Sequence, residues 1–287
     1  MGEKLLLRGA AKINVGLTVL EKRDDGYHNL ESVMQQISLA DSLLFEPAES
    51  DGWQLSCTEA GLSGPHNLVC QAAELLCSRY GRRQRGVKIT LFKNIPVEAG
   101  LAGGSSDAAA ALLGLNRFWE MGLDRRELLN CAAILGSDVP FCLQGGTALV
   151  RGRGETVEKL PDLPFHWVVL ALPPRAGVSA AAAYQAFDRG YLGKPDLSPL
   201  LGAVRSGSRE GLQKWMAEEL TNTLETASLP GLQRAGLLKK QLQSYGLIPA
   251  LSGSGPALFM LFDHYYTAGA AARAVENTGA RSYLCWT

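Results

Sequence analysis

The middle of the chain reads Pro96-Val97-Glu98-Ala99-Gly100-Leu101-Ala102-Gly103-Gly104-Ser105-Ser106-Asp107 and continues into an apolar run of small residues over 108–113. Glycine lets the backbone approach a ligand closely, and the free N–H groups at the start of a helix favour an anion. The stretch therefore predicts an anion-binding loop that opens a helix. Taken alone, it also fits a tight turn whose glycines serve only packing. Asp107 suits the helix dipole, but it would repel a phosphate unless it points away or shares a cation.

The residues on both sides of this loop predict a strand-rich first half. β-Branched and alternating patterns predict strands, and apolar residues at helical spacing predict helices. The expected strands are 13–20, 43–46, 53–57 and 87–92, and the expected helices are 67–80 and 125–135.

The second half shows a different order of elements. Expected strands at 167–172, 247–251, 257–262 and 281–286 alternate with expected helices at 179–187 and 265–277, with further helices up to residue 245. Without the additional helices, this order is β-α-β-β-α-β, which is typical of ferredoxin-like domains. The Pro161–Pro164 stretch resembles a connector, so we expect an α+β protein with domains at 1–160 and 161–287.

Composition narrows the functional classes. The 287 residues are 46% hydrophobic and 20% charged, which is typical of a folded protein with a large core. The 28 basic residues balance 28 acidic residues, which disfavours a nucleic-acid or membrane-surface partner. The chain contains neither a long apolar run nor a C-x-x-C pair, so we expect a cytoplasmic protein with reduced thiols and a small-molecule ligand.

Three further features carry chemistry in combination. A second glycine-rich segment, 251–256, joins two expected strands and also fits a plain hairpin turn. Lys12 interrupts an apolar, strand-like run, where an exposed lysine is the simpler interpretation. Asp138 precedes Val139-Pro140 and also fits an ordinary turn residue.

The order of these features resembles the GHMP kinase superfamily. The motifs that carry the resemblance are Ala11-Lys12-Ile13-Asn14, the 96–108 loop and Ser252-Gly253-Ser254-Gly255. Asp25-Gly26-Tyr27-His28 and Gly136-Ser137-Asp138-Val139-Pro140 are similar to the branch that acts on cytidine diphosphate methylerythritol in the non-mevalonate isoprenoid pathway. The resemblance implies a two-domain GHMP kinase fold, with an N-terminal ATP-binding α/β domain and a C-terminal ferredoxin-like, substrate-binding domain that carries inserted helices.

The resemblance also implies a reaction, in which the γ-phosphoryl group of ATP passes to the 2-hydroxyl of this substrate. Asp138 would accept the hydroxyl proton, and Lys12 would keep that carboxylate ionised and orient it. The implied ATP-binding residues are Lys93, Pro96, Gly100, Leu101, Ala102, Gly103, Gly104, Ser105 and Ser106. Mg²⁺ is expected with ATP, and its protein ligands are unassigned.

The implied substrate-binding residues are Asn14, Tyr27, His28, Asp138, Tyr184, Gly253 and Ser254. His28 would hydrogen-bond the cytosine, Tyr27 would contact it, and Tyr184, five residues after Ser179, would stack on it. A monomer or weak homodimer is expected.

Two alternatives remain open at this point. A non-catalytic ATP- or anion-binding module would need neither Lys12 nor Asp138. A related kinase that acts on mevalonate-like or homoserine-like alcohols would share the loops but would not need a cytosine-binding pair such as Tyr27-His28. A dinucleotide oxidoreductase is disfavoured by the glycine spacing.

Overall fold

The computed structural model describes residues 4–81, 85–187, 195–218 and 221–287. Contacts between residues divide the chain into two units. Unit 1 comprises 1–11, 39–96 and 102–144, and unit 2 comprises 12–38, 97–101 and 145–287. This division differs from the expected single boundary near residue 160, because two long strands, β1 (Leu5–Lys22) and β2 (His28–Pro47), each contribute to both units.

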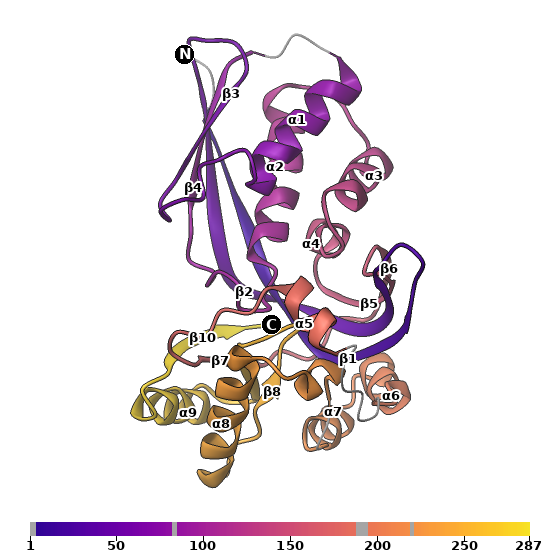
Figure 1. Cartoon of the computed structure of the whole chain (residues 1–287), viewed down its shortest axis with the longest axis vertical. Coiled ribbons are helices and arrows are strands. Elements are labelled where there is room, and N and C mark those ends of the chain that lie inside the picture. The colour runs from indigo at the N-terminus through magenta and orange to yellow at the C-terminus, as the bar shows by residue number, and fades with distance from the viewer. Residues whose placement is uncertain (1–3, 82–84, 188–194, 219–220) are drawn as a thin grey trace. The chain divides into compact units, whose positions relative to one another are not determined.

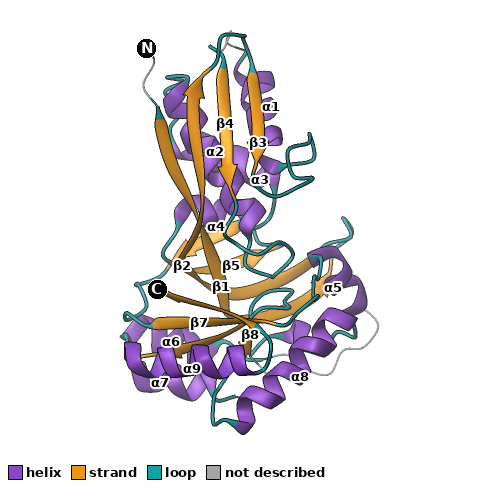
Figure 2. Cartoon of the chain, turned by 90° about the vertical axis from the view of Figure 1, so that its left-hand side faces the viewer, coloured by secondary structure: helices purple, strands orange, loops and turns teal. Residues whose placement is uncertain are grey.

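Unit 1 packs helices on one face of a sheet (Figure 1). Strand β3 (Trp53–Cys57) runs parallel to β4 (Val87–Phe92), and β4 pairs antiparallel with the C-terminal half of β2. Figure 2 shows this sheet in front of α1 (Leu68–Tyr80), α2 (Gly103–Phe118) and α3 (Arg125–Leu135). A Cβ atom on Gly114 would lie 2.2 Å from Cζ of Phe45, so a glycine in the middle of α2 lets the helix approach β2 closely.

The helix starts in unit 1 follow from local capping. The Asn67 side chain accepts a hydrogen bond from the Val69 N–H (2.9 Å) at the start of α1, and Asp124 and Glu127 form a capping box at α3. Both helices confirm the sequence predictions. Helix α2 differs, because it begins at Gly103 and not at the expected residue 108, so that Gly103 and Gly104 belong to its first turn.

Unit 2 contains two groups of strands. The N-terminal half of β2 pairs with β5 (Thr147–Gly152), which pairs with β6 (Thr156–Lys159). The other group is an antiparallel sheet in the order β10-β7-β9-β8. Its strands are β7 (Trp167–Leu172), β8 (Ala250–Leu251), β9 (Leu258–Phe262) and β10 (Arg281–Trp286).

The helices of unit 2 complete the expected ferredoxin-like pattern. Figures 1 and 2 show α8 (Pro230–Ser244) and α9 (Tyr265–Asn277) on the same side of the β7–β10 sheet. The additional segments are α5 (Ala180–Phe187), α6 (Ser198–Ser206), α7 (Arg209–Met216) and the short 3₁₀ helix Thr223–Thr226. The first helix of the pattern is therefore α8 and not the expected helix 179–187, which corresponds to α5. The strand and helix order of this region, and the α+β fold class, are confirmed.

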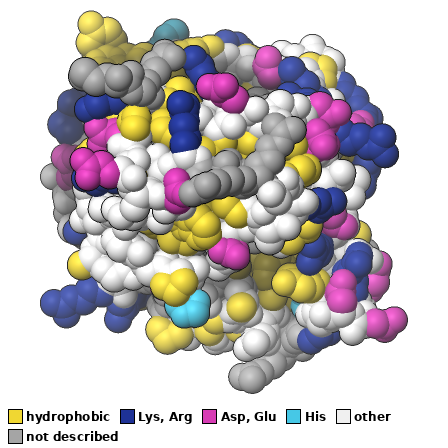
Figure 3. All heavy atoms as spheres, turned by 90° about the horizontal axis from the view of Figure 1, so that it is seen from above, with side chains coloured by type: hydrophobic (Ala, Val, Ile, Leu, Met, Phe, Trp, Pro, Cys, Tyr) yellow, Lys and Arg dark blue, Asp and Glu magenta, His cyan; other side chains and the backbone are white. Residues whose placement is uncertain are grey.

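The surface carries both signs of charge. On the face shown in Figure 3, Lys and Arg side chains are interspersed with Asp and Glu side chains. Across the described ranges, no helix is both long and apolar enough to span a bilayer.

Candidate functional site

Unit 2 brings three sequence motifs to one point. Lys12 is buried, and its Nζ donates hydrogen bonds to Asn14 Oδ1 (2.6 Å) and to the Gly100 carbonyl oxygen (3.0 Å). The same carbonyl accepts a hydrogen bond from Ser252 Oγ (3.1 Å), and the Leu101 carbonyl accepts one from the Lys12 N–H (3.2 Å). The 11–14 motif, the start of the 96–108 loop (the central loop) and the glycine-rich segment 251–256 therefore meet around the Lys12 ammonium group.

Glycine is required on both sides of this junction. Gly100 has φ 76°, and a Cβ there would lie 2.2 Å from the Ser252 carbonyl oxygen. Gly253 has φ 53°, and a Cβ there would lie 2.9 Å from Lys12 Nζ. Positive φ and a close backbone approach both favour glycine, so these residues allow the two segments to touch. A plain hairpin turn at 251–256 would explain why this segment connects β8 to β9, but it would not explain the contact of the segment with Lys12 and Gly100.

The buried side chains of Asn14 and Asn222 form hydrogen bonds that stabilise this junction. The Asn14 Nδ2 donates to Ser32 Oγ (2.8 Å), while its Oδ1 accepts from Lys12. Asn14 therefore orients Lys12, and its predicted contact with substrate stays a prediction. The Asn222 Nδ2 donates to the carbonyls of Leu251 (3.0 Å) and Gly253 (2.8 Å). Asn222 was not foreseen, because a single asparagine between helices carries no sequence signal.

Two of the three predicted cytosine-binding residues contact each other. The rings of His28 and Tyr184 stack with centroids 5.6 Å apart and planes at 20°, and Phe187 meets His28 edge-on at 6.0 Å. Tyr27 is half-exposed, and the Arg153 guanidinium lies 5.2 Å from its ring centroid. Phe187 and Arg153 were not predicted, because their sequence surroundings resemble an ordinary helix and an ordinary turn.

A pocket of about 480 Å³ lies at the turn between β1 and β2. Its lining residues are Lys22, Arg23, Asp24, Asp25 and Asn29, directly before and after Tyr27 and His28. Asp25 Oδ1 accepts a hydrogen bond from the Tyr27 N–H (3.1 Å), which fixes the backbone beside these two residues. The pocket is therefore polar and carries both charges at the place where the sequence predicts substrate recognition.

Unit 1 contributes the helix start of the central loop. Ala102 is the N-cap of α2, has φ 57°, and makes no side-chain capping bond. The Ser106 hydroxyl donates to the Ala10 carbonyl oxygen (2.6 Å), and its N–H donates to the Ala102 carbonyl (2.9 Å). Both Ser106 donors are therefore used within unit 1, and the predicted phosphate contacts of Gly103, Gly104, Ser105 and Ser106 stay predictions.

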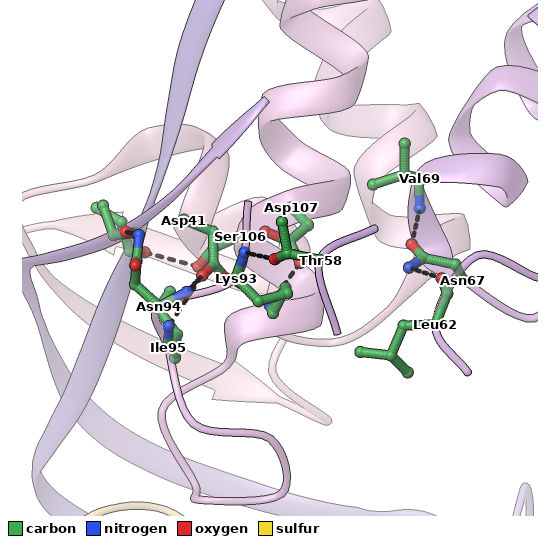
Figure 4. A network of polar contacts seen from close by, with 12 residues as sticks. Asp41, Thr58, Leu62, Asn67, Val69, Lys93, Asn94, Ile95, Ser106 and Asp107 are labelled. Carbon is green, nitrogen blue, oxygen red and sulfur yellow. Dashed lines mark hydrogen bonds and ion pairs between the residues drawn. The ribbon is translucent and has the colours of Figure 1, made fainter. Parts of the chain in front are cut away.

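A buried ion triad stands beside this helix start (Figure 4). Lys93 Nζ forms ion pairs with Asp107 Oδ2 (2.7 Å) and with Asp41 Oδ2. Asp107 thus shares a cation, one of the two arrangements that the sequence left open. Burial raises the pKa of Asp107 to about 7; the Lys93 charge opposes this rise, and the Asp41 charge adds to it. Burial opposes the charged form of Lys93, but the carboxylates of Asp107 and Asp41 raise its pKa overall.

Asp138 lies in unit 1, directly before α4 (Val139–Gln144), and its carbonyl accepts a hydrogen bond from the Cys142 N–H (3.0 Å). Lys12 belongs to unit 2, and the pairing of these two side chains stays a prediction. The predicted ligand contacts of Pro96 and Ser254 likewise stay predictions.

Asp41 was not predicted from the sequence. A charged residue within the apolar run around 37–45 is the same kind of signal that singled out Lys12.

Comparison of the chain with known proteins identifies its family. Residues 67–146 match the family described as GHMP kinases N terminal domain. The 4-diphosphocytidyl-2-C-methyl-D-erythritol kinase of Enterococcus faecalis is 42% identical over 90% of both chains. The enzyme of the same name from Moorella thermoacetica is 43% identical over 96% of this chain and 95% of its own.

Solved structures agree with this placement. A crystal structure of 4-(cytidine 5'-diphospho)-2C-methyl-D-erythritol kinase has a TM-score of 0.79 and 34% identity, with 98% of each chain covered. The mevalonate kinase of Methanococcus jannaschii has a TM-score of 0.72 at 12% identity, covers 99% of this chain and 98% of its own, and shows the shared fold alone. The chain therefore belongs to the family of 4-diphosphocytidyl-2-C-methyl-D-erythritol kinases, a branch of the GHMP kinases.

Proposed function

We propose that the protein transfers the γ-phosphoryl group of ATP to the 2-hydroxyl of 4-diphosphocytidyl-2-C-methyl-D-erythritol, giving the 2-phosphate and ADP, in the non-mevalonate route to isoprenoid precursors. The observation that carries this proposal is the similarity to relatives of that name, at 42–43% identity over nine-tenths or more of both chains. The junction of Lys12, Gly100 and Ser252 supports it, because the motifs of a small-molecule kinase meet there.

Phosphoryl transfer needs a base at the attacking hydroxyl and positive charge near the transferring group. In the proposed step the 2-hydroxyl oxygen forms a bond to the γ-phosphorus, the bond to the bridging oxygen of ADP breaks, and the hydroxyl proton passes to the Asp138 carboxylate. Lys12, held by Asn14 and Gly100, keeps that carboxylate ionised and orients the hydroxyl.

We assign the phosphates of ATP to the central loop and the first turn of α2. That turn lacks a side-chain cap, so its N–H groups suit an anionic ligand. Within the described residues, no group of three or more His, Cys, Asp or Glu side chains could hold a metal ion. Mg²⁺ is expected to be bound mainly by the phosphates of ATP and by water, and its protein ligands stay unassigned.

The functional division into ATP binding at 1–160 and substrate binding at 161–287 stays a prediction. His28, a predicted substrate-binding residue of the first range, belongs to unit 2, which also contains residues 161–287.

We assign cytosine recognition to His28, Tyr27 and Tyr184. The stack of His28 on Tyr184 supports this assignment, because it fixes the plane of the imidazole beside a second aromatic ring. Gly253 and Ser254 are buried in the segment that meets Lys12, where the sequence predicts contact with substrate. A cytoplasmic monomer or weak homodimer without nucleic-acid or membrane partners remains part of the proposal.

The test is direct. The purified protein is incubated with ATP, Mg²⁺ and one alcohol at a time, and release of ADP is followed. Rapid turnover is expected only with 4-diphosphocytidyl-2-C-methyl-D-erythritol. Equal rates with mevalonate or homoserine would assign the protein to a sibling activity, and ATP binding without any turnover would make it a nucleotide-binding module.

A further inference from the structure

The ion triad of Asp41, Lys93 and Asp107 connects the two borders of the central loop. Asp41 Oδ1 accepts hydrogen bonds from the N–H groups of Asn94 (2.5 Å) and Ile95 (2.9 Å), directly before Pro96. Asp107 lies in the second turn of α2, at the C-terminal border of the loop. Lys93 Nζ pairs with both carboxylates, and Figure 4 shows it between them.

The triad is deeply buried, and its charges do not balance. The side chains of Lys93, Asp41 and Asp107 are 6%, 0% and 3% exposed. Two ionised carboxylates around one ammonium leave a net negative charge, and within the described chain Asp107 Oδ1 has no hydrogen-bond partner. Burial of an uncompensated charge is unfavourable, so packing alone does not account for a second carboxylate here.

The ammonium of Lys93 also lies against the helix start that we assign to phosphate. A Cβ on Gly103 would lie 3.3 Å from Lys93 Nζ and 3.1 Å from Ile95 Cγ2. Lys93 and Ile95 therefore lie directly beside the first residue of α2. Because two carboxylates bind it, Lys93 is better suited to hold this turn in place than to bind a phosphate itself.

We propose that Asp107 is a positioning residue for ATP, whose carboxylate, bound to Lys93 and through it to Asp41, holds the first turn of α2 in register with the residues before Pro96. This inference rests on the proposed function only in taking ATP as the ligand of the loop. Asp41 keeps Lys93 in place in either protonation state of Asp107, and ionised Asp107 then adds the connection to α2.

The triad makes the connection dependent on pH. The groups that face Asp107 are Lys93 after β4, Asp41 on β2 and the Cys57 thiol on β3, whose pKa is raised chiefly by burial. Asp107 has a pKa of about 7, above its ordinary value of 3.8, so it is mostly protonated at pH 5.5 and mostly ionised at pH 8.5. A neutral carboxyl binds an ammonium more weakly than a carboxylate does, so the connection is stronger at the higher pH.

The contribution of Asp107 to the free energy of unfolding falls as pH rises, whereas its connection to Lys93 becomes stronger. A folded-state pKa above the unfolded value means that the folded protein holds the proton more tightly, so this group lowers the free energy of unfolding as pH rises from about 4 to about 7. The variant Asp107→Asn removes the ionisation. At about pH 8.5 it is therefore expected to be at least as stable as the wild type, although its connection to Lys93 is weaker.

The experiment measures the Kd of ATP with Mg²⁺ by calorimetry, without an alcohol acceptor, for wild type and Asp107→Asn. The ratio of the two Kd values cancels the titration of ATP itself. We expect a ratio near one at about pH 5.5 and about ten at about pH 8.5, the factor expected for one charge-assisted hydrogen bond. The melting temperature of the variant at about pH 8.5 should equal or exceed that of wild type.

Glu74→Gln is the matched control, because it removes one negative charge from an exposed position on α1 in the same unit. Its Kd ratio should stay near one at both pH values. A ratio for Asp107→Asn that does not change with pH, or a loss of affinity accompanied by a lower melting temperature at about pH 8.5, would overturn the proposal. A wild type that binds ATP but does not phosphorylate the cytidine substrate would contradict the proposed function and leave this test intact.

Discussion

The Lys12 junction makes a quantitative prediction for Gly100→Ala. The added Cβ would lie 2.2 Å from the Ser252 carbonyl oxygen and 2.7 Å from the Gly255 nitrogen, both backbone atoms of a buried segment. An ordinary contact is about 1 Å longer, so one of the two segments must move by roughly that amount. The Gly100 carbonyl that binds Lys12 and Ser252 moves with it.

Two costs are expected in Gly100→Ala. The left-handed conformation costs a non-glycine residue about 1–2 kcal/mol, and overpacking typically adds about 1–3 kcal/mol to the loss of stability. A displacement of about 1 Å near the reacting groups can lower the rate about 100-fold. We therefore expect kcat to fall by about two orders of magnitude at saturating ATP and cytidine substrate.

Gly279→Ala is the matched control in the same unit. Gly279 has φ 81°, close to the 76° of Gly100, and no atom lies within 4 Å of an added Cβ. It should show only the conformational cost of about 1–2 kcal/mol in urea unfolding, with unchanged kcat. If Gly100→Ala matched Gly279→Ala in both stability and kcat, the close approach of the two segments would have no role in orienting Lys12.

Five further variants test the remaining assignments. Asp138→Asn should lower kcat by about two orders of magnitude or more with the Kd of ATP largely kept, and Lys12→Met should also lower kcat; near wild-type rates in both would make the two residues structural. His28→Ala should narrow the kcat/KM preference for the cytidylyl over the uridylyl substrate, whereas Tyr184→Ala should weaken both substrates by a similar factor; an unchanged ratio in the histidine variant would remove it from base recognition. Gly103→Val should weaken ATP binding sharply, because a β-branched side chain stands where the backbone is expected to approach phosphate; a loss of stability with affinity kept would favour a packing role for the loop glycines, such as the 3.1 Å approach of this Cβ to Ile95.

Much of the fold follows from local patterns in the sequence. The expected strands 53–57, 87–92, 167–172 and 281–286 coincide with β3, β4, β7 and β10, because their apolar residues alternate or form short buried runs. Strand β2 was expected only over 43–46, since Gln35, Gln36 and Ser38 interrupt its apolar pattern. Gln35 is buried nonetheless, because its Oε1 accepts a hydrogen bond from Thr147 on β5. Such a distant partner leaves no local signal.

The site shows the same limit. Lys12, Gly100 and Gly253 could be singled out from the sequence because a buried lysine and clustered glycines are unusual locally. Their contact was not predictable from spacing, since Lys12 and Ser252 belong to opposite ends of the chain. The Asp41–Lys93 pair, 52 residues apart, was missed for the same reason. Only a three-dimensional arrangement shows which charged residues compensate one another.

The sharing of β1 and β2 between the two units has a consequence for the order of folding during synthesis. All segments of unit 1 lie within the first 144 residues, so this unit can form before the rest of the chain has been made. Unit 2 needs residues 12–38 together with the C-terminal segments, and Asn14 and Ser252 are 238 residues apart. The N-terminal half of β2 must therefore wait for β5, and the Gly100 carbonyl that binds Lys12 gains its contact with Ser252 only after Ser252 has left the ribosome. A chain released before that point would contain the assigned ATP loop and the direct partners of Lys12, but it would lack the Ser252 hydrogen bond that fixes the Gly100 carbonyl.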